Sequence, residues 1–73
     1  MNDLAAALRE FCRSAGQGKK VVAIHLFGIR NAAALDGRDL HDLAERAGIG
    51  RSFGTELRKG VRLADYVQVV RTP

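Results

Sequence analysis

Tryptophan is absent from this 73-residue chain, and aromatic residues, cysteine and proline are scarce. The single cysteine, Cys12, excludes an internal disulfide, so the fold must hold without a covalent crosslink and suits a reducing cytoplasm. Because only three Phe and one Tyr stand among 47% hydrophobic residues, aliphatic side chains must fill the core. A chain this short buries only about 60% of the surface that its unfolded form exposes, so we expect one domain over residues 1–73.

The chain also lacks a long apolar run and a secretory signal. Residues 1–4 do not combine a basic start with an apolar stretch. The longest apolar segment, Val21–Ile29, contains His25 and is far too short to span a bilayer. We therefore expect a soluble cytoplasmic protein without a membrane partner.

Catalytic and metal-binding patterns are missing as well. Among Cys12, His25 and His41, no pair has the spacing of a zinc site or forms a nucleophile–base pair with an orienting group. We expect His25 to be a hydrogen-bonded residue in the core or at its boundary and His41 to face solvent. Gly16–Lys20 lacks the spacing of a phosphate-binding loop and a preceding strand. The sequence predicts no enzymatic activity, catalytic residue, cofactor, metal or small-molecule substrate.

A first helix is predicted over residues 3–15. Asn2 or Asp3 is suited to cap its N-terminus, and Gly16–Gly18 ends it. The apolar positions that recur at helical spacing are Leu4, Leu8, Phe11, Cys12 and Ala15.

A second helix is predicted over residues 20–34. Val21–Phe27 also suits a buried strand, because it is rich in β-branched residues. The apolar pattern continues through Leu35, beyond the length of most strands, and no partner strand of similar strength is evident, which favours the helix. Gly28 weakens a helix by about 1 kcal/mol relative to Ala, which indicates close packing by a neighbouring helix.

Two further helices, over residues 40–47 and 53–64, are joined by a turn of about four residues. Asp39 and Asp42, three residues apart, have the spacing of a capping box. Gly48 suits a left-handed stop after the first of these helices, and Ser52 suits the N-cap of the second.

The last helix is predicted to have an apolar face and a cationic face. Its inward residues are Phe53, Leu57, Val61 and Ala64, and its outward wall contains Thr55, Arg58, Lys59 and Arg62. Alternatively, Gly60 ends this helix early. Tyr66–Val70 is expected to be extended or an apolar tail. The predicted fold class is all-α, a compact helix-turn-helix bundle of about four helices with a short extended C-terminal tail.

Leu43–Leu57 resembles the helix-turn-helix of bacterial repressors. A small residue, Ala44, lets the second helix cross closely, and Gly48 takes a positive φ in the turn. Ile49 fills the space beneath the turn, and Leu57 holds the second helix against the first. The resemblance implies that the second helix of the motif is exposed at the surface of the domain and contacts DNA.

The sequence departs from this pattern at Gly54, where family members usually have an apolar residue. We expect Phe53 to provide that packing, which rotates the second helix. More broadly, Ala23–Ile29 together with Gly54–Gly60 resembles a bacterial family of HTH-like domain proteins. That resemblance implies a fold and no measured function.

Charge is distributed unevenly along the chain, whose net charge is +4. Residues 36–45 hold four acids and one base, whereas residues 51–62 hold four bases and one acid. The cationic segment favours an acidic partner such as nucleic acid.

The resemblance to the helix-turn-helix of bacterial repressors implies double-stranded DNA as the partner and the helix over 53–64 as the element in the major groove. Residues near its start suit base edges or phosphates, and later ones suit the backbone. We expect Arg51 and Arg58 to contribute specificity and Lys59 to act as an anchor. The predicted DNA-binding residues are Arg51, Ser52, Thr55, Arg58, Lys59 and Arg62, with Lys19 and Lys20 as auxiliary phosphate contacts.

One such helix covers few base pairs, so we expect a homodimer with Tyr66–Val70 as its dimer element. The resulting hypothesis is a small bacterial transcriptional or DNA-associated regulator. The alternative is a protein-interaction module with the same fold, in which the acidic helix from Asp39 to Glu45 meets a basic partner or the basic helix of another copy.

Overall fold

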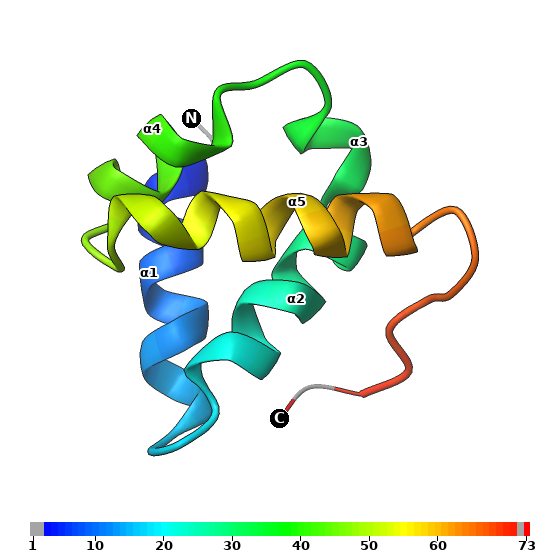
Figure 1. The fold of residues 1–73 in the computed structure, drawn as a ribbon. Coiled ribbons are helices and arrows are strands. Elements are labelled where there is room, and N and C mark those ends of the chain that lie inside the picture. Colours follow the sequence, from blue (N-terminus) through cyan, green and yellow to red (C-terminus); the bar gives the residue numbers. More distant parts are fainter. Residues whose placement is uncertain (1–2, 72) are drawn as a thin grey trace.

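The computed structural model describes residues 3–71 and 73. Its elements are α1 (Leu4–Ala15), α2 (Lys20–Arg30), α3 (Ala32–Leu35), α4 (Leu40–Arg46), the 3-10 helix η1 (Arg51–Phe53) and α5 (Gly54–Leu63) (Figure 1). No strand occurs in this described part of the chain, which confirms the predicted all-α class and the helical interpretation of Val21–Phe27. α5 lies across α2, with α4 near its N-terminal end and α3 near its C-terminal half, and α1 packs against α2 and α4 (Figure 1).

The core is aliphatic, as the composition requires. Its five largest fully buried side chains come one from each α-helix, and burial of each stabilises the fold by about 1.5–3 kcal/mol. Phe27 is the single buried aromatic residue among those described, and its ring packs at a tilt against that of Phe11, with centroids 5.9 Å apart. The five side chains are Leu8, Ile24, Leu35, Leu40 and Leu57.

The first helix begins where the sequence predicts. The Asp3 carboxylate accepts hydrogen bonds from the backbone N–H groups of Ala5 and Ala6, at 3.1 and 3.2 Å, and is therefore the N-cap. The other candidate cap, Asn2, lies outside the described residues. Gly16 ends the helix with a φ of +92°.

The predicted helix over 20–34 is wrong in one respect, because it is broken at Asn31 into α2 and α3. Both the backbone N–H and the side-chain amide of Asn31 donate to the Phe27 carbonyl, each at 3.0 Å. The backbone bond is the ordinary helical bond that ends α2, the side-chain amide binds the same carbonyl, and Asn31 leaves the helical conformation with a φ of −112° and a ψ of 22°. The chain then starts a new turn at Ala32.

α2 and α5 cross at two glycines, Gly28 and Gly60. A Cβ on Gly28 would lie 2.5 Å from the Leu57 carbonyl oxygen, and a Cβ on Gly60 would meet the His25 carbonyl oxygen. The close packing predicted for Gly28 is therefore confirmed. Gly60 does not end the helix, which continues to Leu63.

α4 and the turn after it follow the predicted helix-turn-helix. The Asp39 carboxylate accepts from the N–H of Asp42 at 3.1 Å, and this bond lowers the pKa of Asp39. At the other end, Gly48 has a φ of +75°. The N–H of Gly48 donates to Glu45 O and that of Ile49 to Ala44 O, which is the Schellman pattern of a helix C-terminus.

The start of α5 differs from the prediction. Ser52 was expected as an N-cap, but it lies inside η1, and neither η1 nor α5 has a side-chain cap. The buried face of α5 consists of Gly54, Leu57 and Gly60, while Phe53, Val61 and Ala64 are half-buried. α5 is thus rotated about its axis relative to the prediction, so that its glycines face the core in place of Phe53, Val61 and Ala64.

After Leu63 the chain turns, and residues 64–71 and 73 contain neither helix nor strand, in agreement with the expected extended tail. The tail lies beside Ile29, Arg30 and Ala64, with which it lines a groove of about 510 Å³. No helix in residues 3–71 has the length and apolarity that crossing a membrane requires.

Candidate functional site

The outward wall of α5 is exposed. Its four side chains follow one another at intervals of three, one and three residues and so share one face of the helix. Together with His41 of α4 they line a hollow of about 230 Å³. The wall residues are Thr55, Arg58, Lys59 and Arg62, which their spacing in the sequence predicts to lie on one face.

This wall faces outward because the opposite face of α5 is packed against α2 and α4. Leu57 is fully buried, and Gly54 and Gly60 let the neighbouring backbones approach. At Gly54 a Cβ would lie 2.7 Å from both the N and the Cα of His41. Glycine at the position where the repressor pattern has an apolar residue therefore brings α4 against the start of α5.

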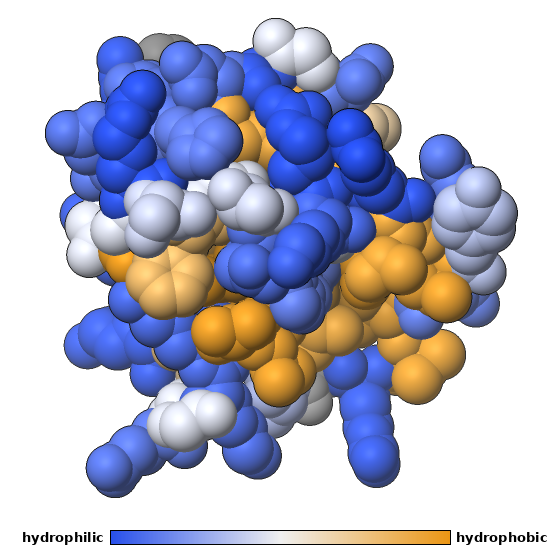
Figure 2. All heavy atoms as spheres, viewed as in Figure 1, coloured by the Kyte–Doolittle hydropathy of each residue, from blue (hydrophilic) through white to orange (hydrophobic). Residues whose placement is uncertain are grey.

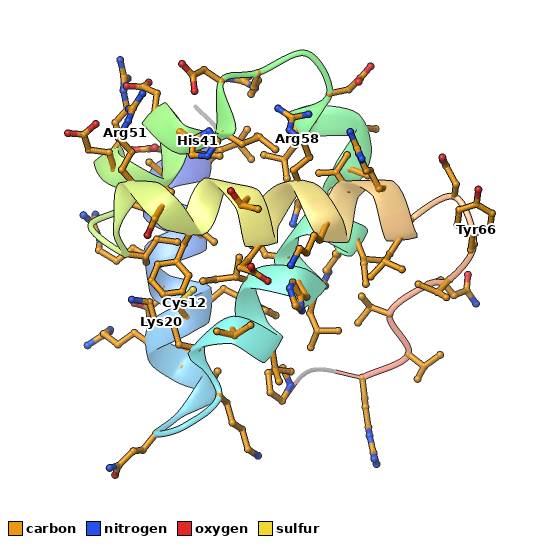
Figure 3. The ribbon with its side chains drawn as sticks, viewed as in Figure 1. Cys12, Lys20, His41, Arg51, Arg58 and Tyr66 are labelled. Carbon is orange, nitrogen blue, oxygen red and sulfur yellow. The ribbon has the colours of Figure 1, made fainter. Side chains whose placement is uncertain are left out.

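His41 was expected to face solvent but is half-buried beside α5. Its Nε2 lies 3.4 Å from the Thr55 hydroxyl oxygen. Figure 3 shows His41 and Arg58 on the same side of α5. Sequence reasoning omitted His41 from the site. The sequence feature that indicates its place is Gly54, a residue small enough for α4 to contact the start of α5.

Glu56 is the one acid of α5, and two basic groups bind it. Its Oε1 lies 2.7 Å from His25 Nε2, and its Oε2 accepts from Lys59 Nζ at 3.3 Å. These hydrogen bonds, that of His25 first, lower the pKa of Glu56. The predicted hydrogen bonding of His25 is confirmed, and of the two expected places, core or boundary, the half-buried His25 occupies the boundary. Because its carboxylate is bound, Glu56 opposes an approaching anion less than a free acid would.

Arg51 and Ser52 lie on η1, before the wall begins. Arg51 Nη1 is 3.0 Å from Glu45 Oε1, and both side chains are exposed. Ser52 is exposed as well. An ion pair of this kind stabilises a protein by only about 0–1 kcal/mol, so a stronger anion can displace Glu45.

Lys20 is held by the fold at a place distant from the wall. Its ammonium donates to the Ile49 carbonyl at 2.7 Å and lies 4.2 Å from the centroid of the Phe53 ring. In the view of Figure 3, Lys20 and Arg58 lie on opposite sides of α5. Lys19, which precedes α2, is exposed. The two lysines are therefore not joined to the hollow.

The described residues of the C-terminal tail leave the wall exposed, and Tyr66 borders it beside Lys59 and Arg62. Tyr66 projects beyond the end of α5, away from Arg58 (Figure 3). Tyr66 and Val70 are each 85% exposed, and Leu63 is 43% exposed. Figure 2 shows hydrophobic surface at the C-terminal end of α5 and hydrophilic surface over its middle.

Potential metal ligands and nucleophiles do not gather at this site. In residues 3–71 and 73, no three His, Cys, Asp or Glu side chains are close enough to share a metal ion. Cys12 is half-buried, and burial raises the pKa of its thiol more than nearby Lys20 lowers it. The groups gathered in the hollow are hydrogen-bond donors and cations, which are suited to binding an anion.

A family model described as "HTH-like domain" matches residues 1–70. No curated protein and no solved structure matches the chain.

Proposed function

The chain belongs to the HTH-like domain family, and from this premise we propose that it binds double-stranded DNA with α5 in the major groove. The observation that carries the proposal is the exposed wall of α5, where three cations and a hydroxyl lie on one face that the tail does not cover. The turn at Gly48 supports it, because it sets α5 at the protein surface after α4.

The wall supplies the two kinds of contact that DNA binding needs. Arginine binds guanine edges or phosphates through two parallel hydrogen bonds, whereas lysine acts as a point charge. We assign base-edge contacts to Arg58 and Arg51 and backbone contacts to Lys59 and Arg62. To contact DNA, Arg51 gives up its ion pair with Glu45. Ser52 and Thr55 supply hydroxyl donors near the start of the helix.

We further propose that the protein is a bacterial-type transcriptional or DNA-associated regulator that acts in the cytoplasm as a homodimer. A single helix contacts few base pairs, so a second copy increases both affinity and specificity. The exposed apolar side chains of Tyr66 and Val70 support the tail as the dimer element.

The competing hypothesis, assembly through the acidic segment, has less support. Asp42 pairs with Arg46 at 3.0 Å, and Glu45 pairs with Arg51 at 3.0 Å. Asp39 caps α4. The Asp39 carboxylate is thus occupied, whereas the two ion pairs are exposed and are exchanged as easily as any surface pair of about 0–1 kcal/mol, so only Asp42 and Glu45 stay open to a basic partner.

The test is duplex binding measured over a range of salt concentrations. Replacing Arg58 and Lys59 with Ala should weaken binding and lower the log–log salt slope by roughly 0.9 for each lost phosphate contact. The control, Arg9→Ala with Arg13→Ala on α1, removes the same charge away from the wall and should change the slope much less. Equal effects of the two double variants, or no binding by the unmodified protein, would refute the proposal.

A second measurement separates DNA binding from assembly. Amide shifts caused by a random-sequence duplex should map to residues 51–62. Shifts in that segment that depend on protein concentration without DNA would instead support the interaction module.

A further inference from the structure

We propose that the hollow between α4 and α5 binds one phosphate of the nucleic-acid backbone and that His41 of α4 is one of its ligands. The inference rests on the proposed function and assigns a phosphate-contacting residue that lies outside α5. The hollow has a volume of about 230 Å³. Since one water occupies about 30 Å³ in the liquid, a phosphate group fits there with some of its hydration.

Every residue that lines the hollow brings a hydrogen-bond donor, and none is an acid. The donors come from both helices of the motif: the ring of His41 from α4, and a hydroxyl, an ammonium and two guanidinium groups from α5. An arginine fork matches the geometry of phosphate oxygens, and the hydroxyl of Thr55 and the ring of His41 suit the remaining oxygens.

The charges in the hollow are not balanced within the protein. Of its three cations, Lys59 alone takes part in an ion pair among the described residues, with Glu56. Arg58 and Arg62 stand four residues apart on one helix face, where like charges destabilise the helix. A bound phosphate removes this repulsion, so the free protein is organised for an anion.

The position of His41 depends on the contact at Gly54. Because a side chain at position 54 would overlap the backbone of His41, glycine there lets the first turn of α4 lie against α5. The His41 ring then reaches the Thr55 hydroxyl at 3.4 Å, long for a hydrogen bond. Both groups therefore keep hydrogen-bonding capacity for a ligand.

The first experiment titrates sodium phosphate into the protein against sodium chloride at equal ionic strength, observed by NMR. We expect saturable shifts of the His41 ring, the Thr55 amide and the Arg62 guanidinium that chloride does not reproduce. The guanidinium of Arg9 on α1 is the internal control and should not follow the same curve. Shifts that are identical with chloride, or that spread to Arg9 without saturation, would overturn the inference.

The second experiment measures duplex binding by Thr55→Val and His41→Leu. Thr55→Val keeps the side-chain shape and removes the hydroxyl, so it remains informative if His41→Leu fails to fold. Loss of a hydrogen bond to a charged group should weaken binding roughly tenfold, and Thr55→Ser should restore it.

The outcomes separate the two proposals. Unchanged duplex affinity in Thr55→Val and in folded His41→Leu would overturn the hollow as the phosphate site and leave DNA binding by α5 intact. Saturable phosphate binding without duplex binding would refute the proposed function and the nucleic-acid backbone as the source of the phosphate.

Discussion

Replacing Gly28 with alanine tests the close crossing of α2 and α5. The added Cβ would lie 2.5 Å from the Leu57 carbonyl oxygen and 3.0 Å from both the Gly60 Cα and the Val61 N. All three neighbours are backbone atoms, so no side-chain rotation relieves the overlap. The two helices must move apart or bend.

Two effects of opposite sign determine the magnitude. Alanine is favoured over glycine by about 1 kcal/mol in a helix, whereas overpacking costs typically about 1–3 kcal/mol and occasionally more. Separating two helices by roughly 1 Å also removes a quarter to a half of the dispersion energy between the atoms that are moved apart. Because backbone meets backbone here, we expect a net loss of about 2 kcal/mol from a total stability of about 4–11 kcal/mol.

Thermal unfolding followed by circular dichroism measures this loss. A decrease of about 2 kcal/mol should lower the Tm by roughly 8–16 °C in a domain of this size. The control is Ala7→Gly at an exposed position of α1, which should cost about 1 kcal/mol from helix propensity alone. A Gly28→Ala protein with a Tm equal to or above that of the unmodified protein would show that the crossing is not close.

Three other substitutions test separate parts of the structure. Gly48→Ala should cost roughly 1–2 kcal/mol, because the φ is +75° and no atom hinders the Cβ; urea unfolding measures this loss, and a neutral result would contradict the left-handed turn. Glu56→Gln should lower the Tm near neutral pH, because the lowered pKa of Glu56 stabilises the folded protein only while the carboxylate is ionised. The Tm difference between the variant and the unmodified protein should therefore shrink as the pH falls below the ordinary pKa of about 4.5. A Tm difference that does not depend on pH would contradict this reasoning. Lys20→Met should cost about 1 kcal/mol in thermal unfolding through its bond to Ile49 and leave duplex affinity unchanged, whereas weaker duplex binding by a fully stable variant would identify Lys20 as a phosphate contact.

Much of the fold follows from short-range chemistry that the sequence displays. Asp3 and Asp39 cap helices because a carboxylate two or three residues before a free N–H is positioned by the helix itself. Gly48 ends α4 because glycine takes the left-handed conformation without a steric cost. The spacing of four residues likewise suffices to put them on one helix face whatever the helix packs against: Thr55, Arg58, Lys59 and Arg62.

Local competition between hydrogen bonds was harder to predict. The break at Asn31 depends on a side-chain amide that binds the Phe27 carbonyl, and the same residue type is tolerated within many helices. The missing cap at Ser52 has a similar origin, because the chain enters α5 through a 3-10 turn in which Phe53 N–H donates to the Gly50 carbonyl.

The sequence by itself determined the helical class, the helix-turn-helix and the cationic wall of α5, because each depends on residues a few positions apart. Only the tertiary structure decided the rotation of α5 and the place of His41, because both depend on backbones meeting at Gly54, Gly28 and Gly60. It also decided that Lys20 binds Ile49, a contact across 29 residues of chain. Contacts of this kind are set by how whole helices pack, and no local pattern of residues records them.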